Sequence, residues 1–267
     1  VPRPRNTRPG ANAATVAIEC AVTGASRVEA IETPVPSLIR EVFTAANAIQ
    51  SGQADLALAV GFDKHDRGAF GSDPAQYGLP EWYADAGLMV TTQFFALKLQ
   101  RYLHQYDLDP RLLAEIVAKA LRNGSRTPHA WRRKAISADD IAGADMVNDP
   151  LTKFMFCSPS EGAAALVLAS SRKAAELSVP KVWLKSVEIR TRQYGTFETF
   201  SPSLAAEITP GPTVFAARAA FESAGVAPSE IDVAQVQDTE AGAELMHLAE
   251  CGLCDDGEQG DLIMSGA

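Results

Sequence analysis

The sequence predicts an α/β protein in which amphipathic helices and apolar strands alternate, and two observations lead to that class. Segments with apolar residues at helical spacing are followed by a glycine and then by a short run of aliphatic residues. Apolar residues make up 46% of the 267 residues but aromatic residues only 7%, so aliphatic side chains supply most of the core. A chain of this length can bury one large core or two small ones without disulfides.

Charge and composition exclude several classes of protein. The formal net charge of −9 argues against a general nucleic-acid binder, whose phosphate contacts need a basic field. No run approaches the ~18 consecutive apolar residues that suggest a membrane span. The basic first residues lack the apolar stretch of a secretory signal. Four scattered cysteines do not form a disulfide framework, so we expect a cytoplasmic protein with no bound metal.

The first elements follow from the alternation of helix and strand. Residues 1–13 are rich in Pro, Arg, Asn and Gly and indicate a flexible arm. Apolar residues at helical spacing predict a helix over 37–51, which Gly52 ends, and the aliphatic run from Leu56 to Val60 predicts a strand. A strand that is apolar throughout is typical of a sheet buried on both faces, as parallel sheets are.

Residues 63–155 differ from this pattern and predict a helical insertion between two strands of one sheet. A long helical pattern covers 84–106. Asp109-Pro110 is a strong start for the next helix, because Asp caps a helix and Pro suits its first position. We expect that helix to stop at Asn123-Gly124. The return strand is predicted over 163–168.

The remaining chain repeats the order of helix, glycine, acidic residue and apolar strand. Strands are predicted over 181–189 and 231–236, with a helix over 212–225 between them. The likeness of this unit to residues 43–61 is a weak repeat signal that fits a duplicated α/β half. A last helix, 241–250, leads into two cysteines and an acidic loop.

Three pieces of the sequence, taken in order, resemble one known family. They are 51–64 (SGQADLALAVGFDK), 157–167 (CSPSEGAAALV), and Gln237-Asp238 leading to Glu244 and then to 250–259 (ECGLCDDGEQ). With a helical insertion between the first two, they resemble the thiolase superfamily, in its sterol-carrier-protein-x-type, or lipid-transfer, branch. The resemblance runs from about Val22 to the C-terminus.

This resemblance implies a thiolase-like five-layer αβαβα fold of two similar halves with a helical loop-domain insertion. It divides the chain into an arm, a first half, a loop domain and a second half, which cover 1–13, 14–62 with 156–175, 63–155 and 176–267. The family handles acyl-CoA thioesters, so coenzyme A enters as part of the substrate and no cofactor is bound covalently. The second half stops before the family's Gly-His-Pro and Cys-Gly-Gly loops, and we expect it to be incomplete.

The family's nucleophilic cysteine is missing from its expected place. In the family a Cys at a helix N-terminus becomes acylated, because the free N–H groups and the helix dipole favour a thiolate there. The matching segment, Thr33-Pro-Val-Pro-Ser37, has no cysteine, and its two prolines lack backbone N–H donors. Ser37 or Thr33 could replace the sulfur only with an activating base, and the sequence shows none.

Three residues remain as candidate catalytic groups. The branch's His-Asp-Cys-Phe segment is Gln237-Asp-Thr-Glu240 here, and a Gln amide can donate to an oxyanion as the family's His does. The family's Asn-Glu pair is Ala243-Glu244, which keeps the acid. We therefore single out Gln237, Asp238 and Glu244. An ordinary strand-end pair is the alternative for the first two.

Five residues are candidate contacts for an acyl-CoA. Lys64 and His65 follow the first strand, where ligands of parallel sheets bind, although charged loop residues are often only solvated. Trp131, Arg132 and Arg133 lie in a basic stretch and could stack on adenine and hold phosphates; an exposed basic loop is the alternative. Residues that could line an acyl tunnel, or simply form core, are Tyr77, Trp82, Tyr83, Phe94 and Phe95.

The cysteines favour packing roles. Cys251-x-x-Cys254 has the spacing of a metal or redox pair, but a zinc site needs about four ligands and the sequence has no second pair. Cys20 and Cys157 are also expected to be buried structural thiols.

We expect a thiolase-superfamily protein that binds a fatty or sterol-derived acyl-CoA thioester and makes or breaks a carbon–carbon bond next to it. The reaction is of retro-aldol or acyltransferase type without an acylated Cys, although the Tyr of such aldolases is Gln237 here. The implied partners are a second copy, a thiolase paralogue or a small zinc-ribbon/OB-fold protein. The alternative is a non-catalytic thiolase-fold subunit that scaffolds an active partner in lipid metabolism.

Overall fold

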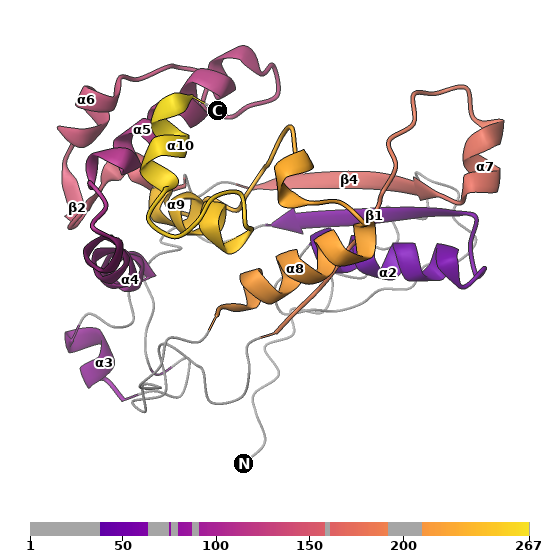
Figure 1. Cartoon of the computed structure of the whole chain (residues 1–267), viewed down its shortest axis with the longest axis horizontal. Helices are drawn as coiled ribbons and strands as arrows, with labels where there is room; N and C mark the ends of the chain where they lie inside the picture. The colour runs from indigo at the N-terminus through magenta and orange to yellow at the C-terminus, as the bar shows by residue number, and fades with distance from the viewer. Residues whose placement is uncertain are drawn as a thin grey trace. The chain divides into compact units, whose positions relative to one another are not determined.

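The computed structural model describes residues 38–63, 75, 80–86, 91–157, 161–191 and 210–266 (Figure 1). The chain divides into two compact units. In the described ranges, the first unit comprises 38–63 and 163–177, and the second comprises the rest. The predicted arm and the Thr33–Ser37 segment lie outside the described residues. The boundaries predicted for the two halves and the loop domain stay predictions.

The first unit contains the predicted helix and strand. Helix α2 (Leu38–Gln50) ends before Gly52, whose φ of 73° is one that other residues rarely adopt. Strand β1 (Leu56–Asp63) follows and packs against α2. The return strand β4 (Gly162–Ala169) is hydrogen-bonded to β1 and leads into helix α7 (Ser171–Glu176). The prediction that a long insertion separates two paired strands is confirmed.

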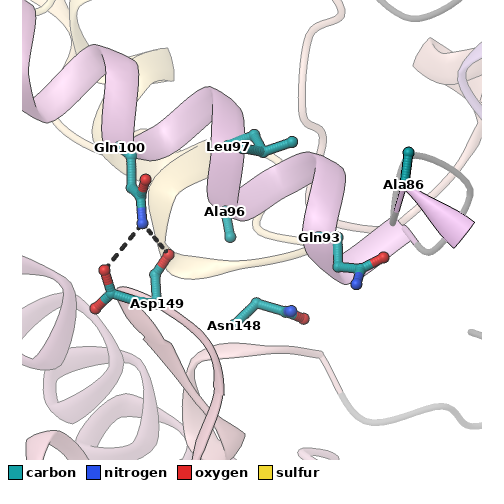
Figure 2. Close-up of a pocket in the computed structure, with 7 residues that line it drawn as sticks. All are labelled: Ala86, Gln93, Ala96, Leu97, Gln100, Asn148 and Asp149. Atoms are coloured by element: carbon teal, nitrogen blue, oxygen red, sulfur yellow. Dashed lines mark hydrogen bonds between the residues drawn. The ribbon is translucent and has the colours of Figure 1, made fainter.

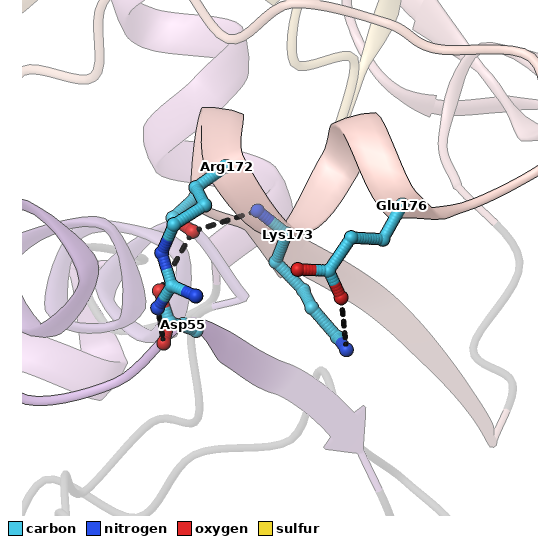
Figure 3. Close-up of polar contacts among 5 residues, drawn as sticks. Asp55, Arg172, Lys173 and Glu176 are labelled. Atoms are coloured by element: carbon cyan, nitrogen blue, oxygen red, sulfur yellow. Dashed lines mark hydrogen bonds and ion pairs between the residues drawn. The ribbon is translucent and has the colours of Figure 1, made fainter.

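The two strands run in opposite directions (Figure 1). The N–H of Ser170, just after β4, donates to the carbonyl of Asp55, just before β1, at 2.9 Å. At the same point Asp55 accepts from the Ser170 hydroxyl and pairs with Arg172 (Figure 3). An insertion between two strands sets no direction for the second strand, so the tertiary fold decides that this pair is antiparallel.

Exposure also differs from the prediction of a strand buried on both faces. Ala59 of β1 is buried, whereas Leu56 and Leu58 are exposed. In β4, Leu166 and Val167 are exposed as well. Helix α2 covers β1, and no second layer over these leucines is present among the described residues of this unit. An apolar sequence shows that a strand can be buried on both faces. Whether a second layer covers the strand depends on the rest of the fold.

The second unit has its core around helix α5 (Arg111–Arg126), which buries seven residues. Helices α4 (Thr91–Tyr106), α6 (Ala138–Ala142), α9 (Ala241–Glu250) and α10 (Gln259–Ser265) belong to the same core. A small hairpin, β2 (Met146–Asn148) with β3 (Leu151–Thr152), closes one side and continues into a 3₁₀ turn, η2 (Lys153–Met155). The largest fully buried aliphatic side chains of this core are Leu99, Leu113, Ile116, Ile141, Leu151 and Leu245.

Helix α5 starts as predicted but ends later. The Asp109 carboxylate accepts from the N–H of Arg111 at 2.8 Å, which caps the first turn. The helix then continues through Gly124 to Arg126, so the predicted stop at Asn123-Gly124 is wrong. A Cβ on Gly124 would lie 2.6 Å from the carbonyl oxygen of Arg132. The glycine is therefore used for a close approach of the following loop, and not as a helix end.

Three other predicted elements are changed. In place of the one predicted helix over 84–106, the structure has a short helix that begins earlier, α3 (Trp82–Asp85), and the separate helix α4. Helix α8 (Pro212–Ala224) and its glycine stop at Gly225 are as predicted. The ranges 181–189 and 231–236 are not strands, because no described segment pairs with them; 231–236 follows a 3₁₀ turn, η3 (Pro228–Glu230). No helix within the described ranges is long and apolar enough to cross a membrane.

Candidate functional site

The segment 237–240, which leads into α9, lies beside the segment that follows η2. The N–H of Cys157 donates to the carbonyl of Thr239 at 3.0 Å, and Phe156 forms an isolated antiparallel bridge with Glu240. These contacts join two of the three pieces of sequence that carry the family resemblance, although about eighty positions separate them in the chain. Their side chains therefore form one candidate site.

Asp238 is an acid of this site whose pKa is changed by its surroundings. Asp238 is an exposed residue, but neighbouring groups partly desolvate its carboxyl group, and this raises the pKa of Asp238 above its usual value. A backbone hydrogen bond and the charge of Lys119 oppose the rise without cancelling it. A carboxylate with a raised pKa is a stronger base than one in water, which is what proton abstraction requires.

Cys157 stands next to this acid and is not the buried residue that the sequence predicts. The residue is exposed, although its thiol is partly desolvated. Burial and then the charge of Asp238 raise the pKa of Cys157, and Arg132 opposes them. The thiol is therefore protonated at neutral pH, unlike the thiolate that acyl transfer needs. Since Arg132 acts on Cys157, the predicted basic stretch reaches the same site.

Glu244 lies in the first turn of α9, and only 8% of it is exposed. Its carboxylate forms an ion pair with Lys119 of α5. Sequence analysis singled out Glu244 but missed Lys119, which belongs to the same site. The signal was an acid within the apolar run 241–246 of α9, because a buried acid needs a cation or hydrogen-bond donors nearby. The packing of α5 against α9 determines which cation pairs with Glu244.

Glu240 adds a second buried carboxyl on the other side of the same segment. Only 2% of Glu240 is exposed, and burial raises its pKa in spite of a hydrogen bond from Thr239. Lys98 and His247 also act on it. His247 pairs in turn with Glu250 at 2.6 Å. Burial pushes the pKa of Glu250 upward, but the contacts with His247 and the charge of Lys98 outweigh it and lower the pKa.

The predicted substrate contacts are only partly brought to this site. Lys64 and His65 lie outside the described residues. Trp131 is 80% exposed and Arg133 is exposed, while Arg132 is half-buried and acts on Cys157. The structure thus connects Arg132 with the 237–240 segment and leaves Trp131 and Arg133 on the surface.

The aromatic residues predicted for a tunnel are described in part. Trp82 stacks on Tyr83 with 4.2 Å between ring centroids, and Trp82 is exposed. Phe95 packs against the core of the second unit, and its ring lies 6.1 Å from that of Phe94. Tyr77 lies outside the described residues. Core packing is therefore the role that the structure supports for Phe95, and the tunnel stays a prediction.

A cavity of about 230 Å³ lies beside α4 and is separate from these residues (Figure 2). The Gln100 side chain donates from Nε2 to the Asp149 carbonyl at 2.8 Å and to its carboxylate at 2.9 Å. None of the residues predicted for the site lines the cavity. Its lining residues are Ala86, Gln93, Ala96, Leu97, Gln100, Asn148 and Asp149.

The cysteines after α9 do not join a metal cluster. Cys251 and Cys254 are free, partly buried thiols, and burial raises the pKa of each. Within the described ranges, no three His, Cys, Asp or Glu residues are grouped so that they could hold a metal ion.

Comparison with known proteins shows the fold and a similarity to one family. Residues 197–267 match the family described as "Thiolase C-terminal domain-like". Sterol carrier protein 2 of Oryctolagus cuniculus is 29% identical over 236 residues, which cover 84% of this chain and 43% of that protein. The benzoylsuccinyl-CoA thiolase subunit BbsB of Thauera aromatica is 23% identical over 218 residues, covering 81% of this chain and 55% of BbsB.

Solved structures show the same fold. The Ltp2–ChsH2(DUF35) aldolase superposes with a TM-score of 0.73 at 24% identity, over 86% of this chain and 60% of the compared chain. The chain thus spans less than two thirds of the length of each protein compared. The matches in sequence and in fold agree with the family resemblance of the three motifs. The chain is therefore similar in sequence to thiolases and to sterol carrier protein 2, and it has the thiolase-like fold.

Proposed function

We propose that this chain binds a fatty or sterol-derived acyl-CoA thioester and breaks or makes a carbon–carbon bond next to the thioester by retro-aldol chemistry, without an acyl-enzyme. The observation that carries this proposal is the pairing of a partly desolvated Asp238 with a protonated Cys157 at the entry to α9. The site offers a base and no thiolate. Similarity to an aldolase of the same fold supports the same reaction class.

Asp238 and Gln237 have distinct parts in this reaction. The carboxylate of Asp238 accepts the proton of the β-hydroxyl group. The bond between the α and β carbons then breaks, its electron pair passes to the thioester as an enolate, and the β carbon leaves as a carbonyl. The side-chain amide of Gln237 donates to the enolate oxygen, and protonation of the α carbon completes the shortened acyl-CoA.

The basic stretch supplies the contacts for coenzyme A in this proposal. Arg132 and Arg133 bind phosphates, and the exposed ring of Trp131 stacks on adenine. Lys64 and His65, which lie outside the described residues, stay predicted substrate contacts. The acidic chain with scattered cysteines favours a cytoplasmic setting.

The test is cleavage of a β-hydroxy acyl-CoA, followed by chromatography of the CoA products. Gln237→Ala and Asp238→Asn are each expected to reduce turnover by about 10²-fold or more, because each removes a group used in the transition state. Asp232→Asn is the matched control, since Asp232 is an exposed acid a few residues upstream. No cleavage by the wild-type protein, with a zinc-ribbon/OB-fold partner present, would overturn the proposal.

The absence of an acyl-enzyme is tested separately. After incubation with acetyl-CoA, intact-mass measurement is expected to show no acetyl adduct on any of the four cysteines. An adduct on Cys157 would instead point to conventional thiolase chemistry.

A non-catalytic subunit is the second candidate, and one observation favours it. BbsB is named as a subunit and the compared aldolase is a complex of two proteins. In that case the chain supports an active paralogue in a hetero-oligomer, and activity appears only in the mixture. Gln237→Ala would then leave the activity of the mixture unchanged, which separates the two proposals.

A further inference from the structure

The basic stretch that is proposed to contact coenzyme A continues directly from the end of helix α5. In an acidic chain, residues 122–134 carry five Arg or Lys side chains, which are Arg122, Arg126, Arg132, Arg133 and Lys134. All of these except Arg132 take part in no ion pair with another described residue. Their positive charge is therefore open to phosphate groups.

Gly124 is the place where this stretch folds back against α5. The N–H of Thr127 donates to the Gly124 carbonyl at 3.1 Å, and its hydroxyl donates to the Asn123 carbonyl at 3.0 Å. A Cβ on Gly124 would lie 2.6 Å from the carbonyl oxygen of Arg132 and 3.8 Å from the Cβ of Ala130. The first of these distances is a clash with a backbone atom, so the stretch itself would have to move.

Gly124 contributes room and not a special backbone conformation. The residue lies inside α5, and it is not among the described glycines with a positive φ. Alanine could adopt the same conformation and is the better helix former. The missing Cβ is therefore what this position supplies to the structure.

The far end of the basic stretch is fixed as well. Ile136 packs against the core of the second unit. The hydroxyl of Ser137 accepts from the N–H of Asp140 at 3.1 Å and so caps α6. Trp131 and Arg133, both exposed, lie between these two anchors. A displacement at Gly124 would therefore move Trp131 and Arg133 and leave the core in place.

We propose that Gly124 is a positioning residue for coenzyme A: its missing side chain lets the basic stretch pack against α5 and so fixes where Trp131 and Arg133 meet the adenine and the phosphates. This inference rests on the proposed function, which supplies the ligand. Gly124 itself does not touch the ligand.

The experiment compares the wild type with Gly124→Ala and with the matched control Asn123→Ala. Both substitutions raise helix propensity at the end of α5, but only Gly124→Ala places a new atom against Arg132. Trypsin cleavage after residues 132–134, located by mass spectrometry, reports whether the stretch has moved. Calorimetry gives the Kd of adenosine 3′,5′-bisphosphate, which carries the adenine and phosphates of coenzyme A.

Gly124→Ala is expected to be cleaved faster than the wild type, and Asn123→Ala to be cleaved at the wild-type rate. The Kd of the bisphosphate is expected to rise by about tenfold in Gly124→Ala alone, as the loss of one charge-assisted contact requires. With an active enzyme, KM for the acyl-CoA rises and kcat is unchanged, because the ground state and the transition state lose the same contact.

A folded Gly124→Ala protein with wild-type cleavage and a wild-type Kd would overturn the proposal. If Gly124→Ala does not fold, Thr127→Ala replaces it, because it removes a hydrogen bond of the same contact without adding an atom; wild-type behaviour of that variant would also overturn the proposal. A wild type that does not bind the bisphosphate would reject both the proposal and the suggested contacts for coenzyme A. Weaker binding by Gly124→Ala, in a protein that cleaves no β-hydroxy acyl-CoA, would support the role of Gly124 and reject the proposed reaction.

Discussion

Cys157 and Asp238 illustrate how single side chains in the candidate site depend on one another. The two groups come from distant parts of the sequence, and the hydrogen bond from the Cys157 N–H to Thr239 brings their segments together. A carboxylate beside a thiol opposes formation of a second negative charge. The thiol is consequently held in its less reactive form, and the acid is left as the reactive group.

This coupling predicts that Asp238→Asn makes Cys157 more reactive. Removing the negative charge lowers the pKa of Cys157, so that a larger thiolate fraction is present at pH 8 and alkylation is faster. The measurement is the rate of iodoacetamide modification at each cysteine, followed by peptide mass spectrometry. Cys251 and Cys254 are internal controls whose rates stay constant. Equal rates at Cys157 in both proteins would contradict the coupling.

Glu240 leads to a prediction about stability and pH. Burial raises the pKa of Glu240 above that of the unfolded chain, so the folded state binds this proton more tightly. The resulting stability is present at low pH and is lost as the pH rises through the folded-state pKa. Glu240→Gln removes this loss, and the variant is expected to be more stable than wild type at pH 7, with the difference vanishing near pH 4.

Urea denaturation at the two pH values measures this effect. Glu188→Gln is a control of opposite sign, because hydrogen bonds from Ser223 and Arg190 lower the pKa of Glu188. That variant is expected to lose stability at pH 7, and the loss becomes smaller as the pH falls through the lowered folded-state pKa of Glu188. If Glu240→Gln were less stable than wild type at pH 7, the prediction would be contradicted, because the folded state would then stabilise the Glu240 carboxylate in spite of its burial.

At the scale of elements, the close packing of α9 against α4 positions the segment that carries the candidate site. Gly242 in the first turn of α9 faces the side chain of Leu99 on α4, which is fully buried. A Cβ at Gly242 would lie 2.8 Å from both terminal carbons of Leu99. The glycine therefore allows the two helices to pack closely, and this packing fixes the start of α9 next to Asp238.

Gly242→Ala is expected to destabilise the protein, although alanine is the better helix former. The gain in helix propensity is about 1 kcal/mol, and the cost of overpacking is about 1–3 kcal/mol. Thermal or urea unfolding measures the balance. Gly162→Ala is the control, because a Cβ there meets nothing within 4 Å. In the Gly242→Ala background, Leu99→Ala is expected to cost less than in wild type, and additive effects would contradict the clash.

At the scale of the whole molecule, large apolar side chains remain on the surface of the second unit. Val182 is 97% exposed and Val233 is 86% exposed, and Trp183 and Leu184 are exposed as well. These residues lie in the two ranges that were predicted as strands and that have no strand partner among the described residues. Exposed apolar residues in extended segments favour association with another polypeptide.

The predicted consequence is self-association of the purified chain. Light scattering after size-exclusion chromatography is expected to give a mass above that of one chain. The double variant Val182→Lys with Val233→Lys is expected to lower that mass, because two charges oppose burial of the segments. Trp131→Lys is the control for an exposed aromatic residue outside these segments. A monomeric wild-type protein at micromolar concentration would contradict the prediction.

Much of the local structure was predictable because it depends on neighbours in the sequence. The helix over 37–51, the strand starting at Leu56, the cap at Asp109 and the helix over 241–250 follow from apolar spacing, glycine and capping residues. The family resemblance also located the Gln237-Asp238 segment. The end of α5 at Arg126 was not predictable, since Gly124 makes room for the carbonyl oxygen of Arg132, eight residues further along the chain.

The sequence by itself determined the α/β class, the helical insertion between two strands, and the absence of cysteine from Thr33–Ser37. The tertiary structure decided that β1 and β4 run in opposite directions, that Lys119 forms an ion pair with Glu244, and that Cys157 lies beside Asp238. Spacing along a helix or strand constrains only residues within a few positions. The charge and reactivity of a buried acid depend instead on groups that packing brings together, and those groups are distant in the chain.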